Sequence, residues 1–124
     1  MIPTLVIVSV SMLALAGVAS WTARRSAAGT LARNDLIGIR TVATQASDAA
    51  WIAAHRAGAA DLRRSAIVAV VTAVLPWCAL LLPGAAQEPV MAAVIVLGAV
   101  TVIGFSVRAA VVGGRAAREV TDRT

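Results

Sequence analysis

Two long stretches of this chain contain no charged residue, and a third contains only one. They cover residues 3–23, 65–82 and 90–112. An α-helix rises about 1.5 Å per residue, so about 20 apolar residues span the ~30 Å hydrocarbon core of a bilayer. A water-soluble domain of 124 residues could not bury a chain that is 60% hydrophobic. The sequence therefore predicts an all-α integral membrane protein with three transmembrane helices in a single domain, residues 1–124.

The first stretch could instead be a cleaved signal peptide. Small residues that would suit a cleavage site are Ala14, Ala16 and Ala19. A signal peptide carries its basic residues before the apolar run, whereas here Arg24 and Arg25 follow it. We therefore expect the first stretch to remain as a membrane helix.

A short segment joins the second and third stretches. Residues 83–89 are bounded by two prolines and are too few to form a domain. We expect a tight turn there, which makes the two spans antiparallel neighbours. Pro76 lies inside the second span, where a proline more often kinks a membrane helix than breaks it.

The third stretch contains two glycines and one arginine. Gly98 and Gly104 offer positions where another helix could pack closely. Arg108 lies about one turn from the end, and the three spans contain no acidic residue, so its side chain is expected to extend to the interface. The helix is predicted to stop at Gly113, which leaves residues 113–124 as a polar tail.

The arginines predict the orientation. The chain has eleven arginines and no lysine, and none lies in the turn at 83–89. Cytoplasmic segments of membrane proteins carry the excess of positive charge. The loop with its helix, 24–64, and the C-terminus are therefore predicted to be cytoplasmic and the N-terminus to lie outside, in a multi-pass protein of the plasma membrane. The loop arginines are Arg24, Arg25, Arg33, Arg40, Arg56, Arg63 and Arg64, and the tail arginines are Arg115, Arg118 and Arg123.

The loop after the first span mixes apolar and polar residues too closely for a solvated linker. Leu36, Ile37 and Ile39 are expected to be buried against the ends of the spans, and Gly38 would allow a close approach of the backbone. Side chains that could bond backbone groups in this loop are those of Asn34 and Thr41, and Arg40 has a planar fork suited to phosphate or to the carbonyls of a helix end.

A helix is predicted to follow this loop. Thr44 or Ser47 would cap its N-terminus. From Ser47 onward, one face carries Trp51, His55, Gly58 and Leu62, and another carries Arg56 and Arg63. We expect a cytoplasmic amphipathic helix that lies along the membrane surface or docks under the bundle, bends at Gly58 and leads into the second span.

His55 is the only histidine, and it could serve as a general base, a proton sensor or a metal ligand. The sequence offers it no companion ligands, so we expect a packed, hydrogen-bonded histidine beside Trp51. No phosphate loop, zinc spacing or nucleophile elbow is present, and we predict no catalytic, cofactor or metal site. Aromatic residues make up only 3% of the chain, which argues against stacking on nucleic-acid bases.

The loop and its helix resemble the signature of the SdpI family. In that signature an Asn precedes Gly-Ile-Arg-Thr-Pro, then come Thr and Ser, and then a Trp stands four residues before a His. Val42 stands where the family has proline, so the turn of this loop is expected to be looser. The matching positions are Asn34, Gly38, Ile39, Arg40, Thr41, Thr44, Ser47, Trp51, His55 and Arg56.

The resemblance implies a small bacterial membrane protein related to an immunity protein against a secreted killing peptide. That immunity protein has more membrane helices than this chain, and one family member holds a transcriptional repressor at the membrane. We therefore expect a non-enzymatic protein that gives immunity to, or senses, a membrane-active peptide. The alternative is a small accessory subunit of a larger membrane complex. Candidate partners are membrane lipids, a membrane protein complex, a second copy of the chain, a peptide toxin or a cytoplasmic regulator. We expect no nucleic-acid partner.

Overall fold

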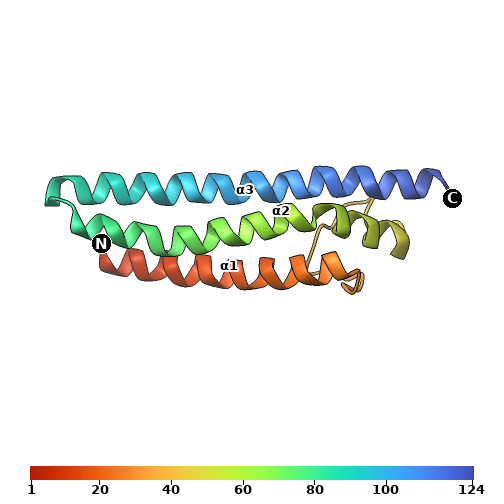
Figure 1. Cartoon of the computed structure of the whole chain (residues 1–124), viewed down its shortest axis with the longest axis horizontal. Helices are drawn as coiled ribbons and strands as arrows, with labels where there is room; N and C mark the ends of the chain where they lie inside the picture. Colours follow the sequence, from red (N-terminus) through yellow and green to blue (C-terminus); the bar gives the residue numbers. More distant parts are fainter.

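Three long helices lie side by side in the computed structural model, which describes residues 1–124 (Figure 1). Helix α1 covers Ile2–Ala28, α2 covers Asp48–Val74 and α3 covers Gly84–Asp122, and a 3₁₀ helix, η1, covers Leu75–Leu81. The three long helices, counting η1 with α2, are long and apolar enough to cross a membrane. Helix α2 lies between α1 and α3 (Figure 1). The predicted all-α fold with three apolar spans is confirmed.

The ends of α1 follow from its terminal residues. Pro3 lies in the first turn, where a missing N–H costs no helical hydrogen bond. Gly29 ends the helix in the left-handed conformation, with φ 69°, and its N–H points to the carbonyls of Arg25 and Ser26. A residue with a Cβ is disfavoured at such a φ, so this glycine determines where the chain turns into the loop.

Helix α2 begins at a side-chain cap and ends at a proline. Ser47 is the N-cap, and its Oγ accepts the N–H of Ala50 at 3.0 Å. Asp48 follows in the first turn, where negative charge is favourable. At the other end, Pro76 has no N–H to continue the α-helical pattern, and the backbone tightens into η1 instead of forming a kinked α-helix.

Small residues bring α2 close to both neighbours. Gly98 of α3 lies against Thr72 of α2, and a Cβ at Gly98 would overlap the threonine side chain. The expected close packing is confirmed at Gly98. The same expectation is wrong at Gly104, where a Cβ would meet no heavy atom within 4 Å. Near the N-terminal end of α1, Ser9 Oγ donates to the Ala73 carbonyl at 2.7 Å and accepts from Trp77 Nε1 at 2.8 Å. These contacts tie α1 to α2 and η1.

The outward faces of α1 and α3 remain apolar and uncovered. In the most apolar segment of α1 and of α3 only 11% of the residues are buried within the protein, against 39% for α2 with η1. Exposed residues include Ile7 and Val10 of α1 and Leu97 and Val100 of α3. Such faces are compatible with hydrocarbon rather than with water.

The helix expected to begin at Ser47 is present, but it is not separated from the second span, because α2 runs without interruption from Asp48 to Val74 with Gly58 inside it. Gly58 is instead a packing position: a Cβ there would lie 2.8 Å from Ile39 Cδ1 and 3.1 Å from the Ala109 carbonyl.

Helix α3 is longer than predicted at both ends. It begins at Gly84 with Pro89 inside it, so the connection from η1 is shorter than the expected turn at 83–89. It continues through Gly113 to Asp122, so residues 113–122 are helical rather than an irregular tail.

Candidate functional site

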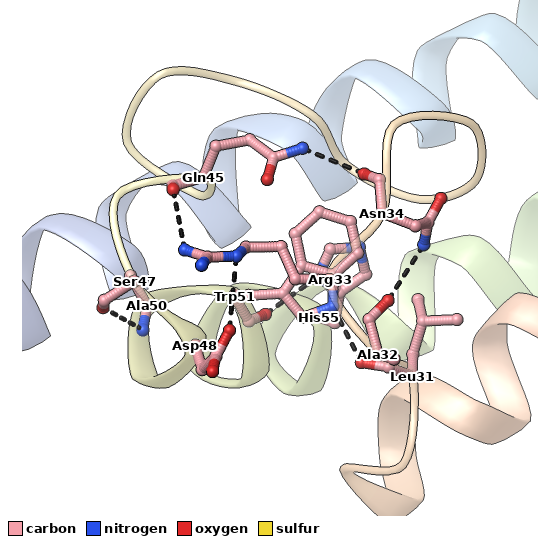
Figure 2. Close-up of polar contacts among 10 residues, drawn as sticks. All are labelled: Leu31, Ala32, Arg33, Asn34, Gln45, Ser47, Asp48, Ala50, Trp51 and His55. Atoms are coloured by element: carbon pink, nitrogen blue, oxygen red, sulfur yellow. Dashed lines mark hydrogen bonds and ion pairs between the residues drawn. The ribbon is translucent and has the colours of Figure 1, made fainter.

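The loop of residues 29–47 closes one end of the helix bundle, and we call this loop together with the first two turns of α2 the cap. Figure 2 shows its polar contacts, which come from the loop and from the start of α2. Most of the residues that carry the family signature lie here.

Asn34 folds the first part of the loop around its own side chain. Its Oδ1 accepts the N–H groups of Leu36 at 2.8 Å and Ile37 at 2.7 Å. Its Nδ2 donates to the carbonyls of Ala32 at 2.9 Å and Ile37 at 3.1 Å. The Asn34 carbonyl accepts from Gln45 Nε2 at 3.0 Å (Figure 2). An Asn that satisfies four local backbone groups replaces regular secondary structure in this segment.

His55 connects the loop to α2. Its Nε2 accepts the N–H of Ile39 at 2.8 Å, and its Nδ1 lies 2.8 Å from the Trp51 carbonyl. These partners assign the neutral tautomer with hydrogen on Nδ1, because a backbone N–H can only donate and a carbonyl can only accept. The side chain is 1% exposed. Burial lowers the pKa of His55 from its ordinary value of 6.5, and the hydrogen bond to Trp51 opposes that shift.

Gly38 makes this contact possible. It has φ 110°, a conformation that residues with a Cβ rarely adopt. A Cβ at Gly38 would overlap His55 Nε2, the atom that accepts the Ile39 N–H. The expected close backbone approach at Gly38 is therefore confirmed, and the group it approaches is the histidine ring.

Ile39 is the apolar anchor of the loop. Its side chain is buried. A Cβ on Gly58 would lie 2.8 Å from Ile39 Cδ1, and a Cβ on Gly113 would lie 3.1 Å from the same atom. The isoleucine thus fills a space between α2 and α3 that exists only because both positions are glycine. The expectation that Leu36 is also buried is wrong, since it is 85% exposed.

Two threonines close the turn after the anchor. Thr44 Oγ1 accepts the Thr41 N–H at 2.9 Å and donates to the Ile39 carbonyl at 2.7 Å. In return, Thr41 Oγ1 accepts the Thr44 N–H at 3.2 Å. Thr44 is fully buried. Of the two candidate helix caps, Ser47 has that role and Thr44 stabilises the turn.

Trp51 lies beneath the start of the loop. Its Nε1 donates to the Leu31 carbonyl at 2.8 Å, and its ring centroid lies 4.1 Å from that of His55. Arg33 adds a second connection, with its Nε 3.2 Å from Asp48 Oδ1 and its Nη1 donating to the Gln45 carbonyl at 3.0 Å (Figure 2). The buried aromatic pair and this ion pair hold both ends of the loop on α2.

Two arginines of the signature and Val42 take no part in the hydrogen bonds between the loop and α2. Arg40 Nη1 donates to the Asp35 carbonyl within the loop, not to a helix end. Arg56 projects from the other face of α2, over Gly29. Val42, at the position of the family proline, is 93% exposed, so the substitution removes no buried contact.

A buried acidic residue of α2 escaped the sequence analysis. Asp61 is only 4% exposed and pairs with Arg64 at 2.7 Å and with Arg108 of α3 at 3.4 Å. Arg108 therefore has an acidic partner, which corrects the expectation that it merely extends to the interface. The Asp61–Arg64 spacing of three residues was a detectable signal, because such pairs meet on a helix. The contact with Arg108 had no local signal.

The polar side chains of the cap hold the loop on α2 and are not arranged as a reactive centre. Both ring nitrogens of His55 are occupied by backbone groups, so neither is free to bind a metal or accept a substrate proton while the cap is closed. Asn34, Thr41 and Thr44 likewise bond backbone groups of the loop. The cap presents Leu36, Val42 and its two arginines, Arg33 and Arg40, outward.

The comparison with known families agrees with the signature in the loop. A family model described as the SdpI/YfhL protein family matches residues 30–108, which is more than half of the chain. No curated protein and no solved structure gives a significant match. The matched residues include almost the whole loop, all of α2 and much of α3.

Proposed function

The chain belongs to the SdpI/YfhL protein family, and from this premise we propose that it is a non-enzymatic plasma-membrane protein that protects against, or senses, a membrane-active peptide. The family match over the loop, α2 and much of α3 carries this proposal. The cap supports it because its polar groups are used for structure. The surface of the cap, rather than a catalytic group, is then where a partner binds.

Leu36 and Val42 are the part of the cap suited to that contact. They are 85% and 93% exposed, and both project from a loop whose backbone is held by internal hydrogen bonds. Exposed apolar side chains on a rigid support lose little conformational freedom on binding. We place the contact with the peptide, or with a regulator that reports it, at these two residues.

The experiment compares cells that lack the chain with cells that express it, each challenged with a panel of membrane-active peptides. Wild type should raise the inhibitory concentration of at least one peptide, and Leu36→Ser with Val42→Ser should abolish the gain. Leu97→Ser with Val100→Ser, on the outward face of α3, is a control for loss of exposed apolar surface. No protection against any peptide by wild type would contradict the proposal.

The orientation of the proposed site rests on the arginines. We propose that the cap and the C-terminus are cytoplasmic and that the N-terminus and the η1–α3 connection lie outside, as the excess of arginine at the cap end predicts. A reporter fused after Thr124 should then report the cytoplasm, and one inserted after Leu82 should report the outside. Reversed signals would overturn this assignment.

A second candidate function is that of an accessory subunit in a larger membrane complex. A groove of about 400 Å³ between α1 and α3, roofed by the loop, favours it. Apolar residues such as Leu15 and Val18 line it together with the hydroxyls of Ser65 and Ser106. Purification in mild detergent followed by mass spectrometry separates the two functions, because a stoichiometric membrane protein partner is expected only for the subunit.

A further inference from the structure

An arginine-lined cleft opens between α1 and α2 on the side of the bundle where Arg56 projects, and we call it the arginine cleft. Its volume is about 710 Å³. Arg24 of α1 and Arg56 and Arg63 of α2 line it, and small side chains such as Ala27 and Ala60 form the remaining wall. The alanines leave room for a ligand, and the guanidinium groups determine the charge that it would carry.

No carboxylate neutralises the arginine cleft. The ion pairs of the chain are Arg33–Asp48, Arg64–Asp61 and Arg108–Asp61, and none of them includes a cleft arginine. Asp61 lies on the same helix as Arg63, but it is buried and paired with Arg108 of α3. Three positive charges therefore meet around one cavity without a counter-ion from the protein. Guanidinium groups in such a setting favour an anion with several oxygens, above all a phosphate.

The positions of the three arginines follow from the helices that carry them. Arg56 and Arg63 are seven residues apart on α2, which places them on the same face two turns apart. The Arg56 guanidinium lies against Gly29, where a Cβ would come within 2.9 Å of Cζ. Arg24 Nε is 3.4 Å from the Ser20 carbonyl, so its terminal nitrogens remain available. The cleft is thus lined by residues of α1 and α2, and the turn that ends α1 lies beside Arg56.

The position along the helices indicates the source of the phosphate. The uncharged stretch of α1 ends at residue 23 and that of α2 begins at residue 65, so the arginines lie where the apolar spans stop. Lipid phosphates occupy this level of a bilayer. Ile67 lies one turn beyond Arg63 on α2, and Trp21 follows the lining residue Ser20 on α1; both are exposed apolar side chains. A ligand with its phosphate in the cleft could lay an acyl chain along this apolar surface.

We propose that the arginine cleft is a binding site for the phosphate of an anionic phospholipid. Arg24, Arg56 and Arg63 bind the phosphate oxygens, and the absence of any carboxylate gives preference for a headgroup with net negative charge. The site is independent of the peptide contact proposed for Leu36 and Val42, because it lies on the other side of α2 and uses none of their atoms. It would fix the depth and tilt of α1 and α2 in the membrane.

The test measures lipid binding to the full chain in detergent by native mass spectrometry. Phosphatidylglycerol should bind at least ~10-fold more tightly than phosphatidylcholine. Replacing Arg24, Arg56 and Arg63 together by Gln should weaken phosphatidylglycerol binding on the order of 100-fold. The charge-matched control is Arg115→Gln, Arg118→Gln and Arg123→Gln, which removes three positive charges from the end of α3. This control should change the affinity less than ~2-fold.

Equal affinity for both lipids would overturn the proposal, as would unchanged affinity in the cleft variant or an equal loss in the α3 control. Inorganic phosphate is the arm that separates lipid from free anion, and displacement of the lipid by ~1 mM phosphate would assign the cleft to free phosphate instead. If the triple variant does not fold, Arg63→Gln alone replaces it, since Arg63 is exposed and makes no hydrogen bond or ion pair. That variant should still weaken binding ~5-fold, and no change would contradict the site.

Discussion

Replacement of Gly38 by alanine tests the close approach of the loop backbone to His55. Gly38 has φ 110°, and the new Cβ would overlap His55 Nε2. Either the loop or the histidine must move. In both cases the 2.8 Å hydrogen bond from the Ile39 N–H to His55 is lost, and the Ile39 anchor is pulled from the space beside Gly58.

The size of the effect follows from two separate costs. A non-glycine residue in a sparsely populated backbone region costs of order 1–3 kcal/mol. A buried N–H left without a partner costs about 1–3 kcal/mol more. Taken in the lower half of each range, the free energy of unfolding should fall by about 3 kcal/mol. For a chain of 124 residues this corresponds to a decrease in Tm of about 10 °C.

Thermal unfolding in detergent, followed by tryptophan fluorescence, measures this decrease. Gly17→Ala is the matched control, because Gly17 lies inside α1 and a Cβ there meets no atom within 4 Å. Alanine is the better helix former by about 1 kcal/mol, so the control should unfold at the same temperature as wild type or higher. If Gly38→Ala were as stable as Gly17→Ala, the contact between Gly38 and His55 would not organise the cap, and the description of the site would be wrong.

Two further predictions concern the ionisable groups. His55 is the only histidine, and burial holds its pKa in the folded protein below the ordinary 6.5. Below pH 6.5 the unfolded chain therefore binds a proton that the folded chain does not. The free energy of unfolding should keep its full value above pH 6.5 and decrease as the pH falls towards the pKa of the folded protein. The decrease is up to about 1.4 kcal/mol per pH unit. Unfolding of wild type and His55→Gln from pH 7.5 to 5 checks this, and the same slope in both would refute it. Asp61→Asn should lower the free energy of unfolding by about 1–2 kcal/mol, because the pairs with Arg64 and Arg108 are weakened. Chemical unfolding measures this loss, with Asp122→Asn at the exposed end of α3 as the control; equal stability of the two variants would show that the buried acid contributes nothing.

The structure also separates two roles within the arginines. Arg33 and Arg108 form ion pairs that connect different elements, and Arg64 pairs with Asp61 on its own helix. Arg56 and Arg63 face the arginine cleft without an acidic partner. The same residue type, counted together for the orientation of the chain, therefore serves the fold in some positions and is available to a ligand in others.

The sequence by itself determined the class of the protein. The three helices follow from uncharged stretches long enough to cross a bilayer, because helical hydrogen bonds and transfer into lipid are properties of each segment alone. The polar contacts of Asn34 and Ser47 were also predicted, since they join groups close in sequence. The position of His55 beside Trp51 followed from their spacing of four residues on one helix. Even there, local reasoning placed Leu36 inside and Thr44 as a possible cap.

Only the tertiary structure decided how the helices meet. The sequence predicted a bend of the helix at Gly58 and a helix end at Gly113, yet both lie within continuous helices. Ile39 fills the space that their missing side chains leave. Asp61 finds Arg108 only after α2 and α3 have adopted their relative rotation. Contacts of this kind depend on the register between segments far apart in the chain, and composition, spacing and propensity describe each segment separately. That is the physical reason why the sequence predicted that Ile39 is buried but not that Gly58 and Gly113 leave the space it fills.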